Sequence, residues 1–307
     1  MKQQTIKKEI KCSGIGLHSG KKVSLNLRPA DEDAGIIFVY KDENGQHRLD
    51  LNPHNVTSTE LATTIGQNGA RIATVEHLLA AVNGLGIDNI YIEVEGTELP
   101  IMDGSAASFV FLIRSAGIRK QRKPRQILAF KKPLMFKEDR RWIRVTPWSG
   151  LRIRYTVNFD HPMIGEQSFV FEHDPQQFIR SLAKARTFGF LRDVEKLQEM
   201  GLALGGSLDN AVVLDEYGVI NPGGMRFNDE LVRHKVLDFM GDMTLMGVSL
   251  WGSFDIHCSG HAFNNLFFRF LASHRDDYLC PVDFESHGQG HKVPEFERVP
   301  RTEPAMA

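Results

Sequence analysis

Apolar and polar residues alternate along several stretches of the chain, and this alternation predicts half-buried β-strands. In the first half of the chain the alternation covers residues 23–27 and 90–94. In the second half it covers residues 142–146 and 151–159. We therefore expect strands in both halves of the molecule.

Between the first two predicted strands, the apolar residues follow the spacing of a helix. In residues 74–84, Val75, Leu78, Leu79 and Val82 recur at the period of a helix, and Thr74 is expected to be its N-cap. Gly84 is expected to end this helix. Further helices are predicted over residues 106–116, 174–185 and 229–246. Two successive units of mixed helix and strand predict an α+β fold and suggest a duplicated architecture.

A basic segment separates the two halves. Residues 119–125 include five lysines and arginines and one proline between two apolar stretches. Such a run is typical of a solvated linker or an exposed connection, so we expect domains at residues 1–125 and 126–285. Residues 286–307 are rich in Gly, Pro and charge and are expected to form a flexible tail.

The composition narrows the possible partners and chemistry. The 307 residues include 37 basic and 38 acidic ones, and a net charge of −1 argues against nucleic-acid binding, which is the alternative for the basic run. The 12 histidines outnumber the 3 cysteines, which form no CxxC pair. We therefore expect imidazole and carboxylate, rather than thiolate, as ligands of any metal. The scattered cysteines, the lack of an apolar leader and the lack of a long apolar run favour a cytoplasmic protein without a membrane span.

The predicted helix over residues 229–246 carries an unusual polar stripe. His234, Asp238 and Asp242 are four residues apart, so they lie on one face of a helix that is apolar on most other sides. Buried carboxylates require a cation or hydrogen-bond donors, which favours a metal or catalytic site. The alternative is a solvent-facing stripe whose carboxylates pair with Arg233 or Lys235.

The predicted helix over residues 74–84 also carries ionisable residues. Glu76 and His77 are adjacent in this otherwise apolar segment. Together, His77, His234 and Asp238 supply two imidazoles and one carboxylate, which is the ligand count of a catalytic zinc site. Glu76 would then be the base that deprotonates water. The same donors match the two-histidine, one-carboxylate site of ferrous oxygenases, so they do not identify the metal.

A third candidate is His261, which follows a glycine in a predicted loop. Such a histidine could donate a proton to a leaving amine or stabilise an oxyanion, with Asp242 orienting its ring. The alternative is a surface-loop histidine with no chemical role.

The order of short motifs identifies a family that the chain resembles. It resembles the bacterial UDP-3-O-acyl-N-acetylglucosamine deacetylases, which are zinc amidases that commit material to lipid A synthesis in Gram-negative bacteria. The resemblance covers nearly the whole chain up to about residue 275. The motifs that carry it are GIGLHSG at 14–20, TVEHL at 74–78, GIDNI at 86–90, PIMDGS at 100–105, ARTFGF at 185–190, GGS at 205–207, RHKVLD at 233–238, GD at 241–242 and SGHA at 259–262.

The resemblance implies roles for the catalytic residues. It makes His77, His234 and Asp238 zinc ligands and Glu76 the general base. It also implies that His261 is the general acid with Asp242 behind it, and that the hydroxyl of Thr187 helps to stabilise the oxyanion.

The resemblance also implies a substrate site and a fold. Lys235 would meet the substrate's diphosphate, Phe159 would stack on uracil, Phe188 would line the passage to the site, and His18 would lie near the nucleotide. The implied fold is two layered α+β domains with small insertions, which face each other across the active-site cleft. An insertion in the second domain would help to form a tunnel for the acyl chain. The expected protein is a monomer that binds this acylated UDP-sugar, with Zn²⁺, or Fe²⁺ in its place, as cofactor.

Two other functions remain open at this point. The first is a ferrous oxygenase that uses the same three ligands. The second is a nucleotide-sugar binding protein without activity, although the presence of Glu76 and His261 argues against it.

Overall fold

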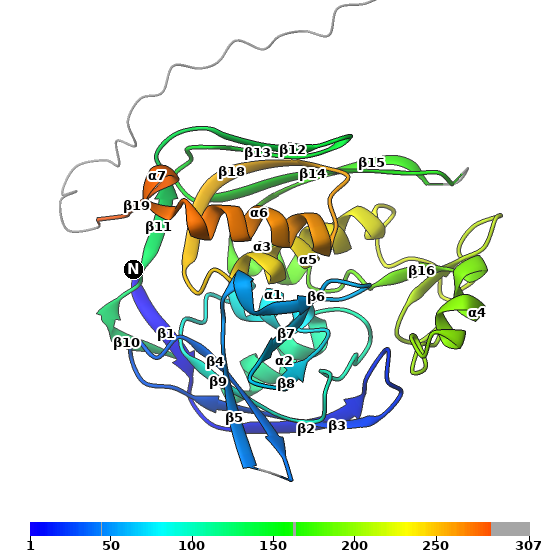
Figure 1. Cartoon of the computed structure of the whole chain (residues 1–307), viewed down its shortest axis with the longest axis horizontal. Helices are drawn as coiled ribbons and strands as arrows, with labels where there is room; N and C mark the ends of the chain where they lie inside the picture. The colour runs from blue at the N-terminus through cyan, green and yellow to red at the C-terminus, as the bar shows by residue number, and fades with distance from the viewer. Residues whose placement is uncertain (44, 162–163, 284–307) are drawn as a thin grey trace, which may run out of the picture.

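The computed structural model describes residues 1–43, 45–161 and 164–283 of the chain (Figure 1). The predicted tail, 286–307, therefore lies outside the described residues. Two large sheets form the outer layers of the described part, and helices lie between them (Figure 1). This arrangement is the α+β fold with layered sheets and helices that the sequence predicts.

The first large sheet has five strands in the order β2-β3-β9-β4-β5. Burial alternates along β3, as the pattern over 23–27 predicts, because every second side chain faces the helices. All neighbouring strands are antiparallel except β4 and β9, which are parallel. The strands are β2 (Ile10–Ile15), β3 (Lys22–Pro29), β4 (Ile36–Asp42), β5 (Gly45–Asp50) and β9 (Ile90–Glu95).

The second large sheet has seven strands. Its path is β12-β13-β18-β11-β19, and β14 joins it by pairing with β18 and with β15. The predictions over 142–146 and 151–159 are confirmed as β13 and β14. The strands are β11 (Ile127–Phe130), β12 (Leu134–Glu138), β13 (Arg141–Thr146), β14 (Leu151–Phe159), β15 (Gly165–Glu172), β18 (Ser249–His257) and β19 (Leu279–Pro281).

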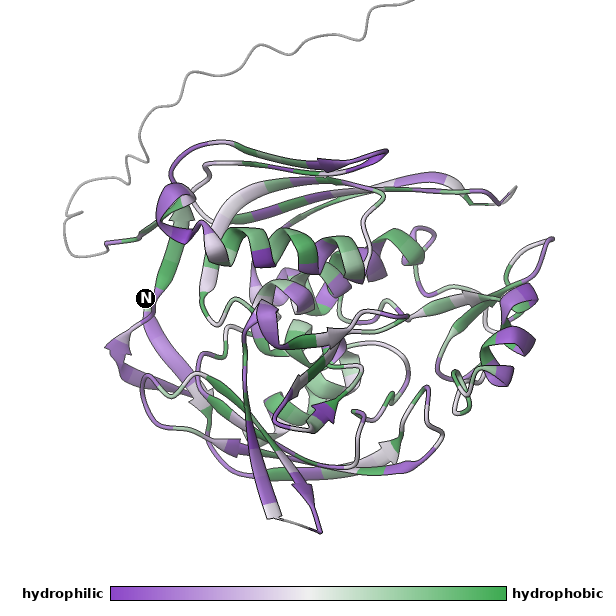
Figure 2. Ribbon diagram, viewed as in Figure 1, coloured by the Kyte–Doolittle hydropathy of each residue, from purple (hydrophilic) through white to green (hydrophobic). Residues whose placement is uncertain are grey.

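The helices between the sheets form most of the core. Their apolar residues are concentrated in the interior, as Figure 2 shows by colour. Eight of the nine residues of α1 and thirteen of the fifteen residues of α5 are buried. The helices between the sheets are α1 (Glu76–Gly84), α2 (Ala107–Ala116), α3 (Pro175–Ser181), α5 (Glu230–Thr244) and α6 (His261–Ser273). The short α7 (Arg275–Tyr278) follows α6 and has no buried residue.

Smaller elements are added to these layers. A three-stranded sheet inserts between β5 and α1, and a second insertion, which contains α4, projects to the side of the layers in Figure 1. These elements are η1 (Pro53–Asn55), β6 (Val56–Ser58), β7 (Thr64–Gln67), β8 (Ala70–Ile72), β16 (Phe188–Phe190), α4 (Leu191–Glu199) and β17 (Val212–Leu214).

The basic run at 119–125 is not a free linker. It lies mostly in β10 (Ile118–Pro124), which pairs antiparallel with β1 (Lys2–Ile6) at the start of the chain. Many of its side chains are exposed, as expected of a basic run, but its backbone hydrogen bonds are made within a two-stranded sheet. The pattern missed this strand because an exposed strand that carries charge on both faces shows no apolar alternation.

The expected N-cap of α1 is wrong. Thr74 has a φ of 58°, and α1 begins at Glu76 after Val75 without a side-chain cap. The hydroxyl of Thr74 instead donates to the buried carboxylate of Glu98 at 3.1 Å. Gly84 is the last residue of α1, as predicted, and a Cβ there would lie 2.4 Å from the ring of Phe178.

Helices α1 and α5 pack against each other at the centre of the molecule. A Cβ on Gly241 of α5 would lie only 2.2 Å from the carbonyl oxygen of Glu76 in α1. Only glycine permits this close approach of the two backbones. None of the helices in residues 1–43, 45–161 and 164–283 is long and apolar enough to cross a bilayer.

Candidate active site

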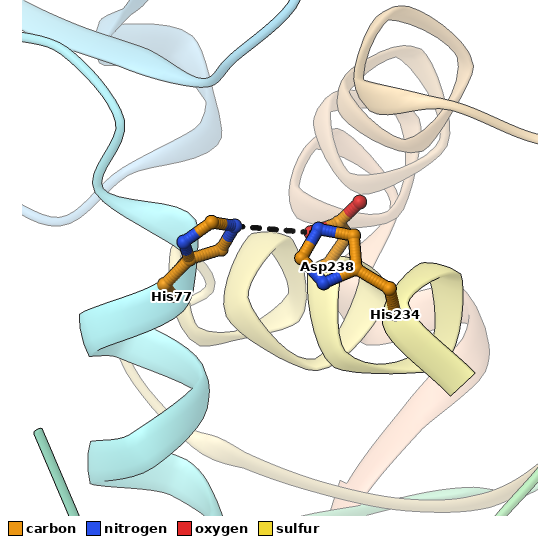
Figure 3. A group of neighbouring side chains, drawn as sticks. All are labelled: His77, His234 and Asp238. Atoms are coloured by element: carbon orange, nitrogen blue, oxygen red, sulfur yellow. Dashed lines mark ion pairs between the residues drawn. The ribbon is translucent and has the colours of Figure 1, made fainter. Parts of the chain in front are cut away.

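The three predicted ligands meet where α1 packs against α5. His77 comes from α1, and His234 and Asp238 lie one turn apart on α5 (Figure 3). The Nε2 atoms of His77 and His234 lie 3.7 and 3.2 Å from Oδ1 of Asp238. One ligand atom of each residue lies within 4.8 Å of the other two, and all three side chains are buried. The stripe on α5 therefore faces the interior and not solvent.

The polar atoms of this cluster suit a cation. Oδ1 of Asp238 is buried and accepts no hydrogen bond from the described residues. Nδ1 of His234 lies 3.1 Å from the carbonyl oxygen of Ala185, which can only accept. Nδ1 therefore carries the ring proton, and Nε2 presents a lone pair toward Asp238, as in many metal sites.

The charge states also suit a metal. Burial lowers the pKa of His77 to about 3, and the neighbouring His234 adds to this shift. Burial likewise lowers the pKa of His234. Burial opposes ionisation of Asp238, but His234 and the ammonium of Lys235 outweigh it and lower the pKa of the carboxyl. Two neutral imidazoles and one carboxylate are donors for zinc or ferrous iron.

Glu76 lies beside this cluster in the first turn of α1. Its Oε2 accepts a hydrogen bond of 3.0 Å from the backbone N–H of Thr63. Burial, together with the charges of Asp238 and Asp242, raises its pKa to about 7, although His261 acts in the opposite direction. A carboxylate with this pKa is suited to accept a proton near neutral pH.

His261 lies on another side of the cluster. It is the first residue of α6 and not a loop residue as predicted. Its Nδ1 lies 3.0 Å from Oδ2 of Asp242, and its Nε2 lies 3.7 Å from Oδ2 of Asp238. Burial opposes protonation, but Asp242 and Asp238 raise the pKa of the imidazole to about 9. His261 is therefore an imidazolium whose Nε2–H faces the candidate metal ligands.

Lys235 makes an ion pair that the sequence suggested only as an alternative. Its Nζ lies 2.7 Å from Oδ2 of Asp238 and 5.5 Å from the centre of the Phe188 ring. The carboxylate of Asp238 thus directs one oxygen to the histidines and the other to Lys235. The ammonium of Lys235 therefore lies next to the cluster.

The aromatic residues predicted to bind substrate form one group beside the candidate metal ligands. The ring of Phe188 contacts the rings of His234 and Phe159 edge-on, at centroid distances of 6.2 and 5.4 Å. Phe188 is in β16, directly after Thr187, whose N–H donates to the carbonyl of Gly104 at 2.8 Å. Thr187 and Phe188 therefore lie where the second insertion meets the first half of the chain.

A largely apolar cavity of about 690 Å³ begins at these residues. It runs beneath α4 and β16–β17, and His18 lies on its wall. Nδ1 of His18 accepts from the N–H of Ala203 at 3.4 Å, and its Nε2 is buried without a hydrogen-bond partner among the described residues. Other residues of the wall include Leu17, Leu61, Leu191, Val194, Leu197 and Val213.

Two polar residues of the site were not predicted from the sequence. The hydroxyl of Thr63 donates to Oδ1 of Asp242 at 2.6 Å, and the amide of Asn264 donates to Oδ2 at 2.8 Å. Asn264 lies one turn after His261 in a mostly apolar helix, so a polar residue at this position could have indicated a part in the site. Thr63 carried no such signal, because threonine is common in short strands and their flanks.

Comparison with known proteins gives one family. The model of the UDP-3-O-acyl N-acetylglycosamine deacetylase (LpxC) family matches residues 3–273. A UDP-3-O-acyl-N-acetylglucosamine deacetylase of Oleidesulfovibrio alaskensis is 60% identical over 307 residues, which is 100% of both chains. One of Nitratidesulfovibrio vulgaris is 55% identical over 283 residues, or 92% of each chain. One of Thioalkalivibrio sulfidiphilus is 44% identical over 295 residues, or 95% of this chain and 97% of its own.

Proposed function

Since the chain belongs to the UDP-3-O-acyl N-acetylglycosamine deacetylase family, we propose that it hydrolyses the N-acetyl group of a UDP-3-O-acyl-N-acetylglucosamine and releases acetate. This reaction is the committed step of lipid A synthesis, in agreement with the resemblance of the sequence motifs. The proposal rests on one observation. A buried set of two histidines and an aspartate has the carboxylate of Glu76 and the imidazolium of His261 beside it.

His77, His234 and Asp238 are the proposed ligands of one divalent cation, and zinc is the proposed metal. Two imidazoles and one carboxylate leave a position open for a small ligand, as in catalytic zinc sites. When bound there, the cation supplies Lewis-acid activation of water and of the acetamide carbonyl.

Glu76 and His261 are the proposed base and acid. Glu76 accepts a proton from water as the water oxygen forms a bond to the acetyl carbon. The C–N bond then breaks, Nε2 of His261 donates its proton to the amine, and acetate leaves. His261 and the hydroxyl of Thr187 are the proposed donors to the oxyanion, and Asp242 stabilises the charge of the imidazolium.

The remaining residues are proposed to bind the substrate. Lys235 and His18 suit the anionic nucleotide part, because Lys235 is a cation beside the cluster and His18 has a buried nitrogen to which none of the described residues hydrogen-bonds. Phe159 offers a face for the uracil, and Phe188 lines the entrance to the apolar cavity. The cavity itself suits a long acyl chain, because its wall is mostly aliphatic.

We also propose that the enzyme is a cytoplasmic monomer. The three cysteines are free, and they lie far apart in the sequence, which suits a reducing compartment. Light scattering during gel filtration measures the oligomeric state directly.

The metal content of the purified protein, measured together with acetate release from the acylated UDP-sugar, tests the proposed function. We expect about one zinc or iron per chain, loss of activity on chelation, and recovery when the active metal is restored. His234→Ala is expected to lose both metal and activity, because it removes one of three ligands. His54→Ala, which changes an exposed histidine, is the matched control. Undiminished acetate release by metal-free protein would contradict the proposed role of the cluster.

A further inference from the structure

Thr63 contacts both sides of the proposed acid–base machinery. Its backbone N–H donates to Oε2 of Glu76 at 3.0 Å. Its hydroxyl lies 2.6 Å from Oδ1 of Asp242 and 3.1 Å from Nδ1 of His261. One buried residue therefore touches the base, the acid and the carboxylate that supports the acid.

These contacts join segments that are far apart in the sequence. Thr63 precedes β7 in the first insertion, whereas Asp242 is in α5 and His261 begins α6. The carbonyl oxygen of Thr63 also accepts from the N–H of Val75, which directly precedes α1. The position of Thr63 is thus fixed to α1 by its backbone, and its side chain reaches the second half of the molecule.

The hydrogen-bond directions follow from counting protons. The hydroxyl has one hydrogen, and the carboxylate of Asp242 can only accept, so the hydroxyl donates to Oδ1. Its lone pairs are then free to accept from Nδ1–H of His261, which lies between Thr63 and Oδ2 of Asp242. The ring of His261 is therefore anchored at two acceptors, and its Nε2 is left directed toward Asp238.

The hydroxyl also satisfies a buried carboxylate oxygen. Oδ2 of Asp242 accepts from Asn264 and lies next to His261, but Oδ1 has the hydroxyl of Thr63 as its only donor among the described residues. Without that hydroxyl, Asp242 would be free to rotate toward other donors, and the ring of His261 would lose its alignment.

We propose that Thr63 is a positioning residue, whose hydroxyl aligns the Asp242–His261 pair while its backbone aligns Glu76. This inference rests on the proposed deacetylase function, because it assigns Thr63 a part in the same reaction. Thr63 acts through its neighbours and does not itself exchange a proton with the substrate.

Thr63→Val tests the proposal, because it removes the hydroxyl and retains the size of the side chain and the backbone N–H. We expect kcat to fall about 10- to 100-fold, as is common when a residue that orients a catalytic group is changed. KM and metal content should stay near the wild-type values. Thr63→Ser, which keeps the hydroxyl, should restore most of kcat.

The matched control is Thr64→Val at the next position. The Thr64 hydroxyl makes no hydrogen bond to the described residues, so this variant should behave as wild type. Thr63→Ala is made in parallel and is judged by the same measurements if Thr63→Val does not fold.

A second readout does not depend on turnover. In metal-free protein with ¹⁵N-labelled histidine, the Nδ1–H signal of His261 should shift and broaden in Thr63→Val but stay in place in Thr63→Ser and Thr64→Val. Absence of acetate release by the wild-type holoenzyme would refute the proposed function, whereas this signal would still report on Thr63.

Two results would overturn the proposal. One is a Thr63→Val enzyme with wild-type kcat and an unchanged His261 signal. The other is a loss of activity that Thr63→Ser does not restore and that is matched by loss of metal, which would show a purely structural role.

Discussion

At the scale of single residues, the surroundings of Glu76 and His261 raise the pKa of each side chain for a different reason. Glu76 and His261 are both buried, and burial favours the neutral form of each. For Glu76 burial prevails and raises the pKa to about 7, whereas for His261 the carboxylates of Asp242 and Asp238 prevail and raise the pKa to about 9. The proposed base and the proposed acid thus lie beside the same three candidate ligands.

We expect Glu76→Gln to lower kcat by about 10²- to 10⁴-fold, the usual contribution of a general base. Metal content should be retained, because Glu76 is adjacent to the ligand His77 but is not one of the three clustered donors. Acetate release and elemental analysis of the same sample measure both quantities.

Glu95→Gln is the control for this substitution, because Glu95 is exposed at the end of β9. Near-wild-type turnover of metal-loaded Glu76→Gln would show that another group accepts the proton.

At the scale of elements, the site depends on the distance between two helices. α1 carries Glu76 and His77, and α5 carries His234, Asp238 and Asp242. The backbones approach each other closely because residue 241 lacks a Cβ. The separation of the helices therefore sets the separation of the proposed ligands.

Gly241→Ala should destabilise the protein and weaken metal binding together. The added Cβ would meet the carbonyl oxygen of Glu76 at 2.2 Å, so the helices must move apart. Overpacking of this kind typically costs about 1–3 kcal/mol. Urea unfolding measures the free energy of unfolding, and titration with a competing chelator measures metal affinity.

Gly223→Ala is the matched control, since a Cβ there would have no atom within 4 Å among the described residues other than Gly223 and its two chain neighbours. If Gly241→Ala bound metal as tightly as wild type, the spacing of the helices would not determine the site.

At the scale of the whole molecule, the two halves share one core. A single hydrophobic cluster includes Leu78 of α1, Ile92 of the first sheet, Val236 of α5 and Phe254 of the second sheet. The proposed catalytic side chains thus come from elements that are held together by burial of apolar surface.

We expect the two halves to unfold in one transition, although chains of this length often unfold through intermediates. The three tryptophans, Trp142, Trp148 and Trp251, all lie in the second half of the chain, so their fluorescence reports on that half. Far-UV circular dichroism reports on both halves. The two signals should give the same urea midpoint, and a change in dichroism that precedes the change in fluorescence would show that the first half unfolds separately.

Much of the fold could be predicted from local patterns. The alternation over 151–159 gave β14 with the same bounds, and the helical period over 229–246 gave α5 to within two residues at its C-terminal end. β10 and the start of α1 were not predicted, because pairing with β1 and the Thr74–Glu98 hydrogen bond are contacts with distant segments. Local patterns do not include partners of this kind.

The sequence alone determined the types of residue in the site, their spacing on α5 and the family that they resemble. These follow from the order of side chains along one helix and from short motifs, which need no knowledge of the fold. Only the tertiary structure decided that His77 lies 3.7 Å from Asp238, that Lys235 pairs with the same carboxylate, and that Thr63 and Asn264 support Asp242. The physical reason is that these contacts join residues far apart in the chain or depend on which way a side chain turns. The long-range contacts and the side-chain orientations are both set by the packing of α1 and α6 on α5 between the two sheets.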